Sequence, residues 1–211
     1  MNKTLECIIL KFAKPQPYES IWQAMRKHID TKPETDEIWF LEHEPVYTQG
    51  QAGLDEHVLQ LNQIPIVHSD RGGQITYHGP GQLIVYTLIN LRTAGIGIRS
   101  MVTLLENCVI ELLMTHGVTA NSKIDAPGVY VNDAKIASLG LRVRHGYCYH
   151  GLAINIDMDL RPFTAINPCG YKGLQVTQIS ALAPDITKEK AINFITKYFQ
   201  NKLKYRKMIL Q

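Results

Sequence analysis

The feature of this sequence that most constrains its fold is a glycine-rich segment, residues 71–82, that leads directly into an apolar run. The segment reads RGGQITYHGPGQ, and its four glycines, proline and threonine leave little side chain to bury. Residues 83–89, LIVYTLI, are almost continuously apolar and predict a strand buried on both faces. Glycine at this density lets the backbone approach a ligand closely and exposes its N–H groups. We therefore interpret the segment as a shaped loop that forms the wall of a substrate pocket.

Length and composition fit one globular domain that spans residues 1–211. Of these residues 45% are hydrophobic and 19% are charged, which is enough for a substantial core. No apolar run approaches the roughly 20 residues that cross a bilayer, and the N-terminus lacks the layout of a signal peptide. A formal net charge of +3 is too small to indicate nucleic-acid binding. We expect a cytoplasmic protein that binds neither membranes nor nucleic acid.

Hydrophobic periodicity predicts the arrangement of helices and strands. Helices are expected at 19–28, 101–114 and 188–204, and strands at 1–12, 37–41, 64–67, 83–89, 129–131, 135–144 and 147–156. In the helix 101–114 a broad apolar face predicts that Glu106 and Glu111 turn away from the core. Turns at 132–133 and 145–146 join the last three strands as hairpins. Hairpins alternating with single helices indicate an α+β fold rather than a doubly wound parallel sheet.

Cys169 is distinguished from the other cysteines by its setting. It lies between Pro168 and Gly170, which fix a tight turn and present the thiol from a loop. The other three cysteines lie in apolar helix or strand settings that are typical of buried structural cysteines: Cys7, Cys108 and Cys148. The sequence contains no C-x-x-C pair. We expect all four thiols to be reduced, and we interpret Cys169 as a nucleophile.

Lys135 is the second candidate for chemistry. With a period of two it shares a strand face with Ala137 and Leu139, while Ser138 and Gly140 line the opposite face. A lysine on an apolar face has a lowered pKa and can hold a neighbouring thiolate or accept a proton. Alternation alone allows a second interpretation, in which a lysine at the end of a strand extends its amine to water.

The histidines do not indicate a metal site. His43 begins the sequence HEPVY, which departs from the zinc pattern H-E-x-x-H, and its proline breaks the helix that this pattern needs. His150 is expected to share a strand face with Cys148, but two ligands do not make a metal site. His78 lies inside the glycine-rich segment, where it could orient a substrate or simply bind the loop backbone. Phosphate-binding glycine motifs and the G-x-S-x-G elbow are absent from the sequence.

Four ordered blocks of this sequence resemble the lipoyl(octanoyl) transferase family. The first is residues 71–82, and the second joins GVYV at 128–131 to KIASLG at 135–140. The third is HGLAIN at 150–155, and the fourth joins NPCG at 167–170 to VT at 176–177. Tyr130 stands where the family has tryptophan and Gln178 where it has serine, and we expect neither to touch the chemistry. The resemblance covers most of residues 71–180.

This resemblance implies a fold like that of biotin and lipoate protein ligases, with a mixed β-sheet flanked by helices. It implies that Cys169 attacks octanoyl-acyl carrier protein to form a thioester, and that Lys135 promotes ionisation of the thiol and assists proton transfer. The acceptors would be lysine amines on the lipoyl domains of 2-oxoacid dehydrogenases and on the glycine cleavage H protein. Neither a cofactor nor a metal is implied. The residues implied to bind substrate are Arg71, Gly72, Gly73, Gln74, Ile75, Thr76, Tyr77, His78, Ser138, Leu139, Gly140, Gly151, Leu152 and Ala153.

Other functions remain open at this point. An ATP-dependent lipoate or biotin ligase of the same fold would activate a free acid and would need no cysteine. An amidotransferase would keep the cysteine and take its acyl group from another carrier domain. A cysteine hydrolase would use Cys169 with His78 or His150 as the base and water as the acceptor. A binding module without activity would not need Cys169 and Lys135 together.

Overall fold

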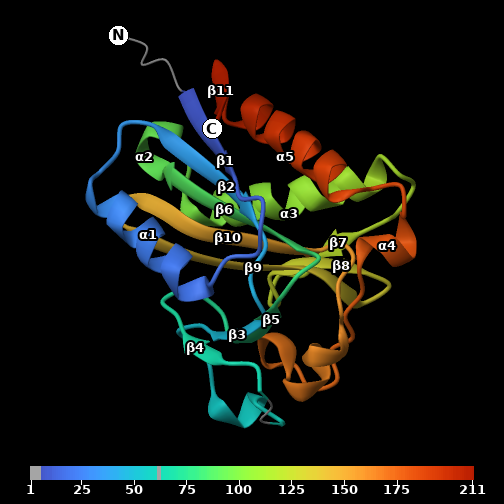
Figure 1. Cartoon of the computed structure of the whole chain (residues 1–211). Helices are drawn as coiled ribbons and strands as arrows, with labels where there is room; N and C mark the ends of the chain where they lie inside the picture. Colours follow the sequence, from blue (N-terminus) through green and yellow to red (C-terminus); the bar gives the residue numbers. More distant parts are fainter. Residues whose placement is uncertain (1–5, 61–62) are drawn as a thin grey trace.

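A mixed β-sheet with helices on both faces forms the centre of the molecule (Figure 1). The computed structural model describes residues 6–60 and 63–211, and within these residues the sheet has eight strands. In spatial order they are β11 (Lys207–Leu210), β1 (Glu6–Lys11), β2 (Asp36–Leu41), β6 (Gln82–Asn90), β10 (Tyr147–Asn155), β9 (Ala134–Arg144), β8 (Gly128–Val131) and β7 (Asn121–Ser122). The pairs β11–β1 and β1–β2 are parallel and the other pairs are antiparallel. The predicted α+β class, with a mixed sheet flanked by helices, is confirmed.

The helices divide between the two faces of this sheet. Long helices α3 (Ile98–Met114) and α5 (Lys188–Lys202) pack on one face and bury the main hydrophobic core. Helix α1 (Tyr18–Asp30) covers the other face, where it packs on β2, β6 and β10. Two short helices, α2 (Leu91–Ala94) and α4 (Ile179–Leu182), lie at connections. All three predicted long helices are therefore present, and each bounds a layer of the core.

One expectation about α3 is wrong. Glu106 does not turn away from the protein but is buried, and its carboxylate accepts a hydrogen bond from the Gly128 N–H at 3.0 Å. Glu111, in contrast, is 39% exposed and pairs with Lys202. The apolar stripe could not predict this difference, because the partner of Glu106 is a backbone group at the start of β8.

The two predicted hairpin turns form at the residues expected for them. Asn132 and Asp133 both have positive φ, 47° and 65°, as a two-residue turn between twisted antiparallel strands requires. His145 and Gly146 do the same between β9 and β10. Strand β6 is buried along its length up to Ile89, as its continuous apolar run predicted. The strand expected at 64–67 is shorter and begins later in the chain, as β4 (Ile66–His68). Residues 1–5 of the predicted first strand lie outside the described range, and β1 (Glu6–Lys11) lies within it.

A second, small sheet lies next to the main one and joins the glycine-rich segment to the Cys169 loop. Its order is β4, β3 (Val46–Gln49) and β5 (Ile75–His78), with β3–β4 parallel and β3–β5 antiparallel. Tyr47, Ile75 and Tyr77 pack in a small core with residues of the 3-10 turn Arg161–Ala165. Two further 3-10 turns are Asp55–His57 and Pro168–Gly170, and the latter carries Cys169.

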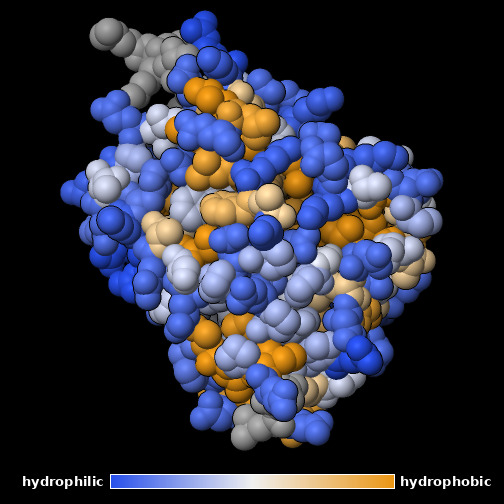
Figure 2. All heavy atoms as spheres, in the orientation of Figure 1, coloured by the Kyte–Doolittle hydropathy of each residue, from blue (hydrophilic) through white to orange (hydrophobic). Residues whose placement is uncertain are grey.

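The surface in view mixes polar and apolar residues. Figure 2 shows hydrophobic residues in separate groups between hydrophilic ones on this face of the molecule. Within residues 6–60 and 63–211, none of the helices combines the length and the apolar character needed to traverse a membrane.

Candidate active site

Cys169 is presented by a strained turn. It lies in the 3-10 turn Pro168–Gly170 with φ 57° and ψ 20°, a left-handed conformation that is uncommon for a residue with a side chain. The Gly170 N–H donates to the Asn167 carbonyl at 2.9 Å and closes the turn. Cys169 is partly exposed, whereas the other three cysteines are buried. Burial raises the pKa of Cys148 to about 12 and also raises the pKa values of Cys7 and Cys108, so these thiols stay protonated.

The amine of Lys135 lies next to this thiol. Its Nζ is 2.9 Å from the Cys169 Sγ and donates a second hydrogen bond to the Pro127 carbonyl at 3.0 Å. Lys135 is 2% exposed, so its ammonium does not reach water as the alternative interpretation proposed. Burial lowers the pKa of the amine, but the Cys169 thiolate and Tyr130 outweigh that effect and leave the pKa above its usual value. Our expectation of a lowered lysine pKa is therefore wrong, because the pairing outweighs the burial.

A β-bulge points Lys135 toward the thiol. The pairing of β8 with β9 shifts by one residue, from Val129 opposite Ala137 to Tyr130 opposite Lys135. Ile136 is the extra residue, and both Ile136 and Ala137 pack in the main core. Lys135 consequently lies on the opposite face from Ala137, contrary to the expectation from a strict period of two. Tyr130 lies on the same face, with its ring 5.3 Å from the Lys135 amine, so it does touch the candidate site.

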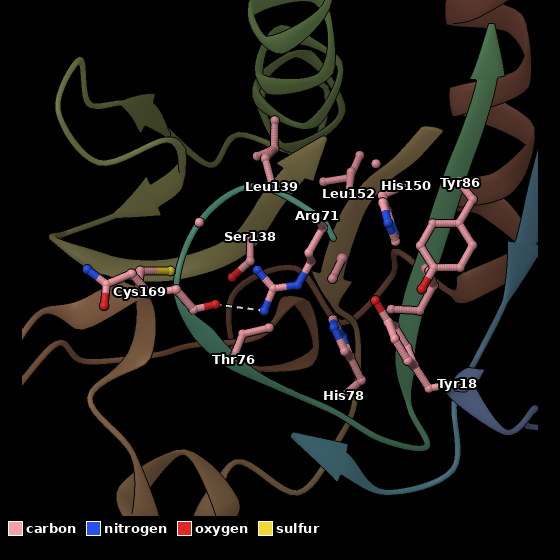
Figure 3. A pocket seen from close by; sticks show the side chains of 16 residues that line it. Tyr18, Arg71, Thr76, His78, Tyr86, Ser138, Leu139, His150, Leu152 and Cys169 are labelled. Carbon is pink, nitrogen blue, oxygen red and sulfur yellow. Dashed lines mark hydrogen bonds between the residues drawn. The ribbon is translucent and has the colours of Figure 1, made fainter. Parts of the chain in front are cut away.

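A cavity of about 470 Å³, counted with its open side, extends from Cys169 along the sheet (Figure 3). Eleven of the residues expected to bind substrate line it: Arg71, Gly73, Gln74, Thr76, His78, Ser138, Leu139, Gly140, Gly151, Leu152 and Ala153. Gly72 lines a neighbouring cavity instead. Ile75 and Tyr77 lie in the small core, because alternate side chains of β5 point to opposite faces. Those two residues are therefore corrections to the expected set.

Four more residues line the cavity that the sequence did not single out as substrate-binding: Tyr18, Ile84, Tyr86 and His150. Figure 3 shows Tyr18, His78, Tyr86 and His150 grouped at the end away from Cys169. Ile84 and Tyr86 are two residues apart on the predicted strand 83–89 and so share one face of it, a pattern that could have identified them as lining residues. Tyr18 comes from α1, and nothing in the local sequence connects that helix to the glycine-rich segment.

His150 enters the cavity because of its backbone. Its φ of 59° interrupts the regular strand, so His150 contacts Tyr86 and Tyr149 while Cys148 packs in the main core. The expectation that Cys148 and His150 share a face is wrong for this reason. The His150 Nε2 is 2.8 Å from the Asp70 carboxylate. Burial lowers the pKa of His150 below its usual value even though Asp70 opposes that shift.

The glycine-rich segment is held by a buried guanidinium. Arg71 donates to the carbonyls of Thr48, Gly72 and Gln74 and to the Thr48 hydroxyl. The Thr48 Oγ1 lies 3.1 Å from His78 Nε2, and His78 Nδ1 donates to the Gln82 side-chain oxygen at 2.7 Å. The His78 ring therefore bonds to two side chains and not to the loop backbone, and it also lines the cavity.

His43 is a structural histidine. Its Nδ1 donates to the Gln16 carbonyl at 2.9 Å, and its Nε2 accepts from the Tyr86 hydroxyl at 2.7 Å. Burial lowers the pKa of His43 to about 4, so the ring is neutral at physiological pH. Across residues 6–60 and 63–211, no group of three or more His, Cys, Asp or Glu side chains is arranged to hold a metal ion.

Comparison with known proteins places this chain in a family. The model of the lipoyl protein ligase A/B catalytic domain matches residues 19–200. Over 171 residues, 80% of each chain, the sequence is 58% identical to an octanoyltransferase of Pseudomonas fluorescens strain Pf0-1. A bipartite lipoate protein ligase of Thermoplasma acidophilum superposes with a TM-score of 0.76 at 16% identity, covering 98% of this chain and 86% of that one. Biotin protein ligase of Aquifex aeolicus superposes with a TM-score of 0.55 at 14% identity, covering 96% and 71%.

The structural likenesses define the class: the chain has the fold of lipoate and biotin protein ligases. Within that class the sequence match is more specific than the fold. The chain belongs to the lipoyl(octanoyl) transferase family, and it is an acyltransferase.

Proposed function

We propose that this chain transfers an octanoyl group from octanoyl-acyl carrier protein, through a thioester on Cys169, to a lysine ε-amine of a lipoyl domain. Family membership supports octanoyl transfer in protein lipoylation. The observation that carries the covalent mechanism is the 2.9 Å contact between Lys135 Nζ and Cys169 Sγ beside a cavity with apolar walls. The acceptors we propose are the lipoyl domains of 2-oxoacid dehydrogenases and the glycine cleavage H protein.

In the first half-reaction the Cys169 thiolate attacks the thioester carbonyl of the donor. A new C–S bond forms as the tetrahedral intermediate develops, and the bond to the donor sulfur breaks when that intermediate collapses. The Lys135 ammonium lies where it can neutralise the attacking thiolate and then donate a proton to the departing thiolate. One thioester replaces another, so the exchange needs no ATP, and the sequence has no phosphate-binding glycine motif.

The cavity is suited to an acyl chain. Ile84, Leu139, Leu152 and Ala153 give it apolar walls, and Gly151 allows β10 to lie close to β6 beside it. A Cβ on Gly151 would lie 2.1 Å from the Val85 carbonyl oxygen, so a side chain there would force β10 away from β6. Each buried methylene contributes about 0.8 kcal/mol of binding. The polar aromatic side chains at the end away from Cys169 would then limit the length of acyl chain that fits: Tyr18, His78, Tyr86 and His150.

In the second half-reaction a lysine amine of the lipoyl domain attacks the thioester carbon. The amide C–N bond forms, the bond to Cys169 Sγ breaks, and the thiolate returns beside the Lys135 ammonium. The incoming ammonium loses one proton to solvent before it attacks, and the bonded nitrogen loses a second as the amide forms. Lys135 in its neutral form is the adjacent group that can accept this second proton.

The covalent intermediate is the decisive test of this proposal. We expect that incubation with octanoyl-acyl carrier protein shifts the intact mass of the protein by one octanoyl group, and that peptide mapping assigns it to Cys169. The Cys169→Ser variant should show no thioester, whereas an ATP-dependent ligase would keep its activity without the thiol. A wild-type protein that turns over without any acyl-enzyme would refute the mechanism.

Lys135 separates the transferase from a hydrolase that uses a histidine as its base. We expect Lys135→Met to slow acylation of Cys169 by about 100-fold or more near neutral pH, because the thiol loses its adjacent cation. The loss should shrink as pH rises and the thiol ionises without help, which rates of loading between pH 6.5 and 9.5 will show. Normal loading in this variant, with water as the acceptor, would favour the hydrolase.

A further inference from the structure

The thiol of Cys169 stands between two cavities, and the acyl chain accounts for one of them. Counted with their open sides, the second cavity has a volume of about 910 Å³ and the first about 470 Å³. The two share Gly73, Gln74, Leu139, Gly140 and Cys169 as a common wall. Beyond that wall, the second cavity lies between the start of α3 and the loop that leads into β8.

We infer that the second cavity receives the 4′-phosphopantetheine arm of the donor carrier protein, an inference that rests on the proposed function. In the tetrahedral intermediate, one carbon bears the acyl chain, the Cys169 sulfur and the donor sulfur. With the acyl chain in the first cavity, the donor sulfur and its arm must leave that carbon in another direction. The second cavity is lined by the same cysteine and opens outward, so it provides that space.

The walls of this cavity match the chemistry of the arm. Ile98, Val102, Pro127, Leu141 and Tyr171 are apolar, and Ile98 and Tyr171 remain 38% and 42% exposed. Exposed apolar side chains beside a reactive group are typical of a surface that a ligand covers. The methylenes and the geminal dimethyl group of pantetheine would cover them.

A polar atom is also available for the first amide of the arm. The Oε1 of Gln74 is buried and has no hydrogen-bond partner among the described residues. Its side chain lies against the Cys169 turn, since a Cβ on Gly170 would be 2.8 Å from that oxygen. Buried acceptors without partners are rare and call for a ligand or a water. The arm carries an amide N–H two carbons from its sulfur, which places a donor near the thiol.

The test fills the second cavity without touching the first. We would compare Ile98→Trp and Val102→Trp with the control Met114→Trp, which adds the same bulk at the exposed end of α3. Loading of Cys169 would be measured with three donors: octanoyl-acyl carrier protein, octanoyl-pantetheine and S-methyl octanethioate, which has no arm. We expect the two cavity variants to lose at least tenfold in kcat/KM with the first two donors and less than threefold with the third.

Three outcomes would overturn the inference. Equal losses with all three donors would mean that the tryptophans damage the reaction centre, and unchanged loading from octanoyl-pantetheine would mean that the arm binds elsewhere. A normal loading rate with slow transfer from pre-loaded enzyme to a lipoyl domain would assign the cavity to the acceptor. Failure of the proposed function looks different, because the wild-type protein would then load from none of the donors.

Discussion

A single glycine leaves the space that the Lys135 side chain occupies. Gly128 has φ 145°, and a Cβ built on it would lie 2.5 Å from Lys135 Cε and 2.8 Å from the Ala137 carbonyl oxygen. Neither neighbour can move freely, since the Lys135 amine is held by Cys169 and Pro127 and the carbonyl belongs to β9. The smallest side chain at this position would therefore displace the amine from the thiol.

This crowding predicts the behaviour of Gly128→Ala. We expect acylation of Cys169 to slow by at least tenfold, because a lost 2.9 Å contact removes the cation from the thiol. Gly97→Ala is the matched control, since a Cβ there meets nothing within 4 Å and its loading rate should stay within twofold. The measurement is the rate of mass shift with octanoyl-acyl carrier protein. A fully active, folded Gly128→Ala protein would show that the amine is not needed where the structure places it.

At the scale of elements, the parts that sequence predicts are those with a local cause. Helix α3, the hairpin turn at Asn132–Asp133 and the buried strand β6 each follow from residues within the element itself. The bulge at Ile136 has no local sign, because it exists only in the pairing of β9 with β8. The order of the eight strands and the contribution of Tyr18 to the cavity likewise depend on contacts between distant segments. Sequence blocks thus identified Cys169 and Lys135 as candidates, while the structure alone shows how they meet.

Helix α3 supports the candidate site through one buried carboxylate. Glu106 accepts the Gly128 N–H, and the adjacent Pro127 carbonyl accepts from the Lys135 amine. We expect Glu106→Ala to lower the free energy of unfolding by about 1–3 kcal/mol, because it leaves a buried N–H unpaired. Loading should also slow in Glu106→Ala and recover in Glu106→Gln, whose amide oxygen can accept the same bond.

The matched control for this prediction lies on the same helix. Glu111→Ala removes an exposed ion pair with Lys202 and should change the free energy of unfolding by less than about 0.5 kcal/mol. Urea unfolding and the loading rate are measured for all three variants. Equal effects of the two alanine substitutions would contradict a specific role for Glu106.

At the scale of the whole molecule, neutral histidines are buried where the two sheets meet. His43 and His78 lie 5.8 Å apart between ring centroids, and Tyr86 contacts both His43 and His150. Burial lowers the pKa values of all three rings, and the nearby Arg71 guanidinium lowers those of His78 and His150 further. Hydrogen bonds oppose this shift without reversing it: His43 bonds to the Gln16 carbonyl, His78 to the Gln82 side chain and His150 to Asp70. The polar interior therefore depends on these rings remaining uncharged.

This burial makes the fold sensitive to acid. In the unfolded chain a histidine takes up a proton below a pKa of about 6.5, whereas folded His43 stays neutral down to about 4. Because the unfolded state binds the proton first, stability falls as pH decreases from 6.5 to 4, by about 3 kcal/mol for His43 alone. Urea unfolding between pH 7 and 4 should show that slope, made steeper by His78 and His150. His43→Gln should flatten it and the exposed His116→Gln should not, and a wild-type stability that is constant across this range would contradict the assignment.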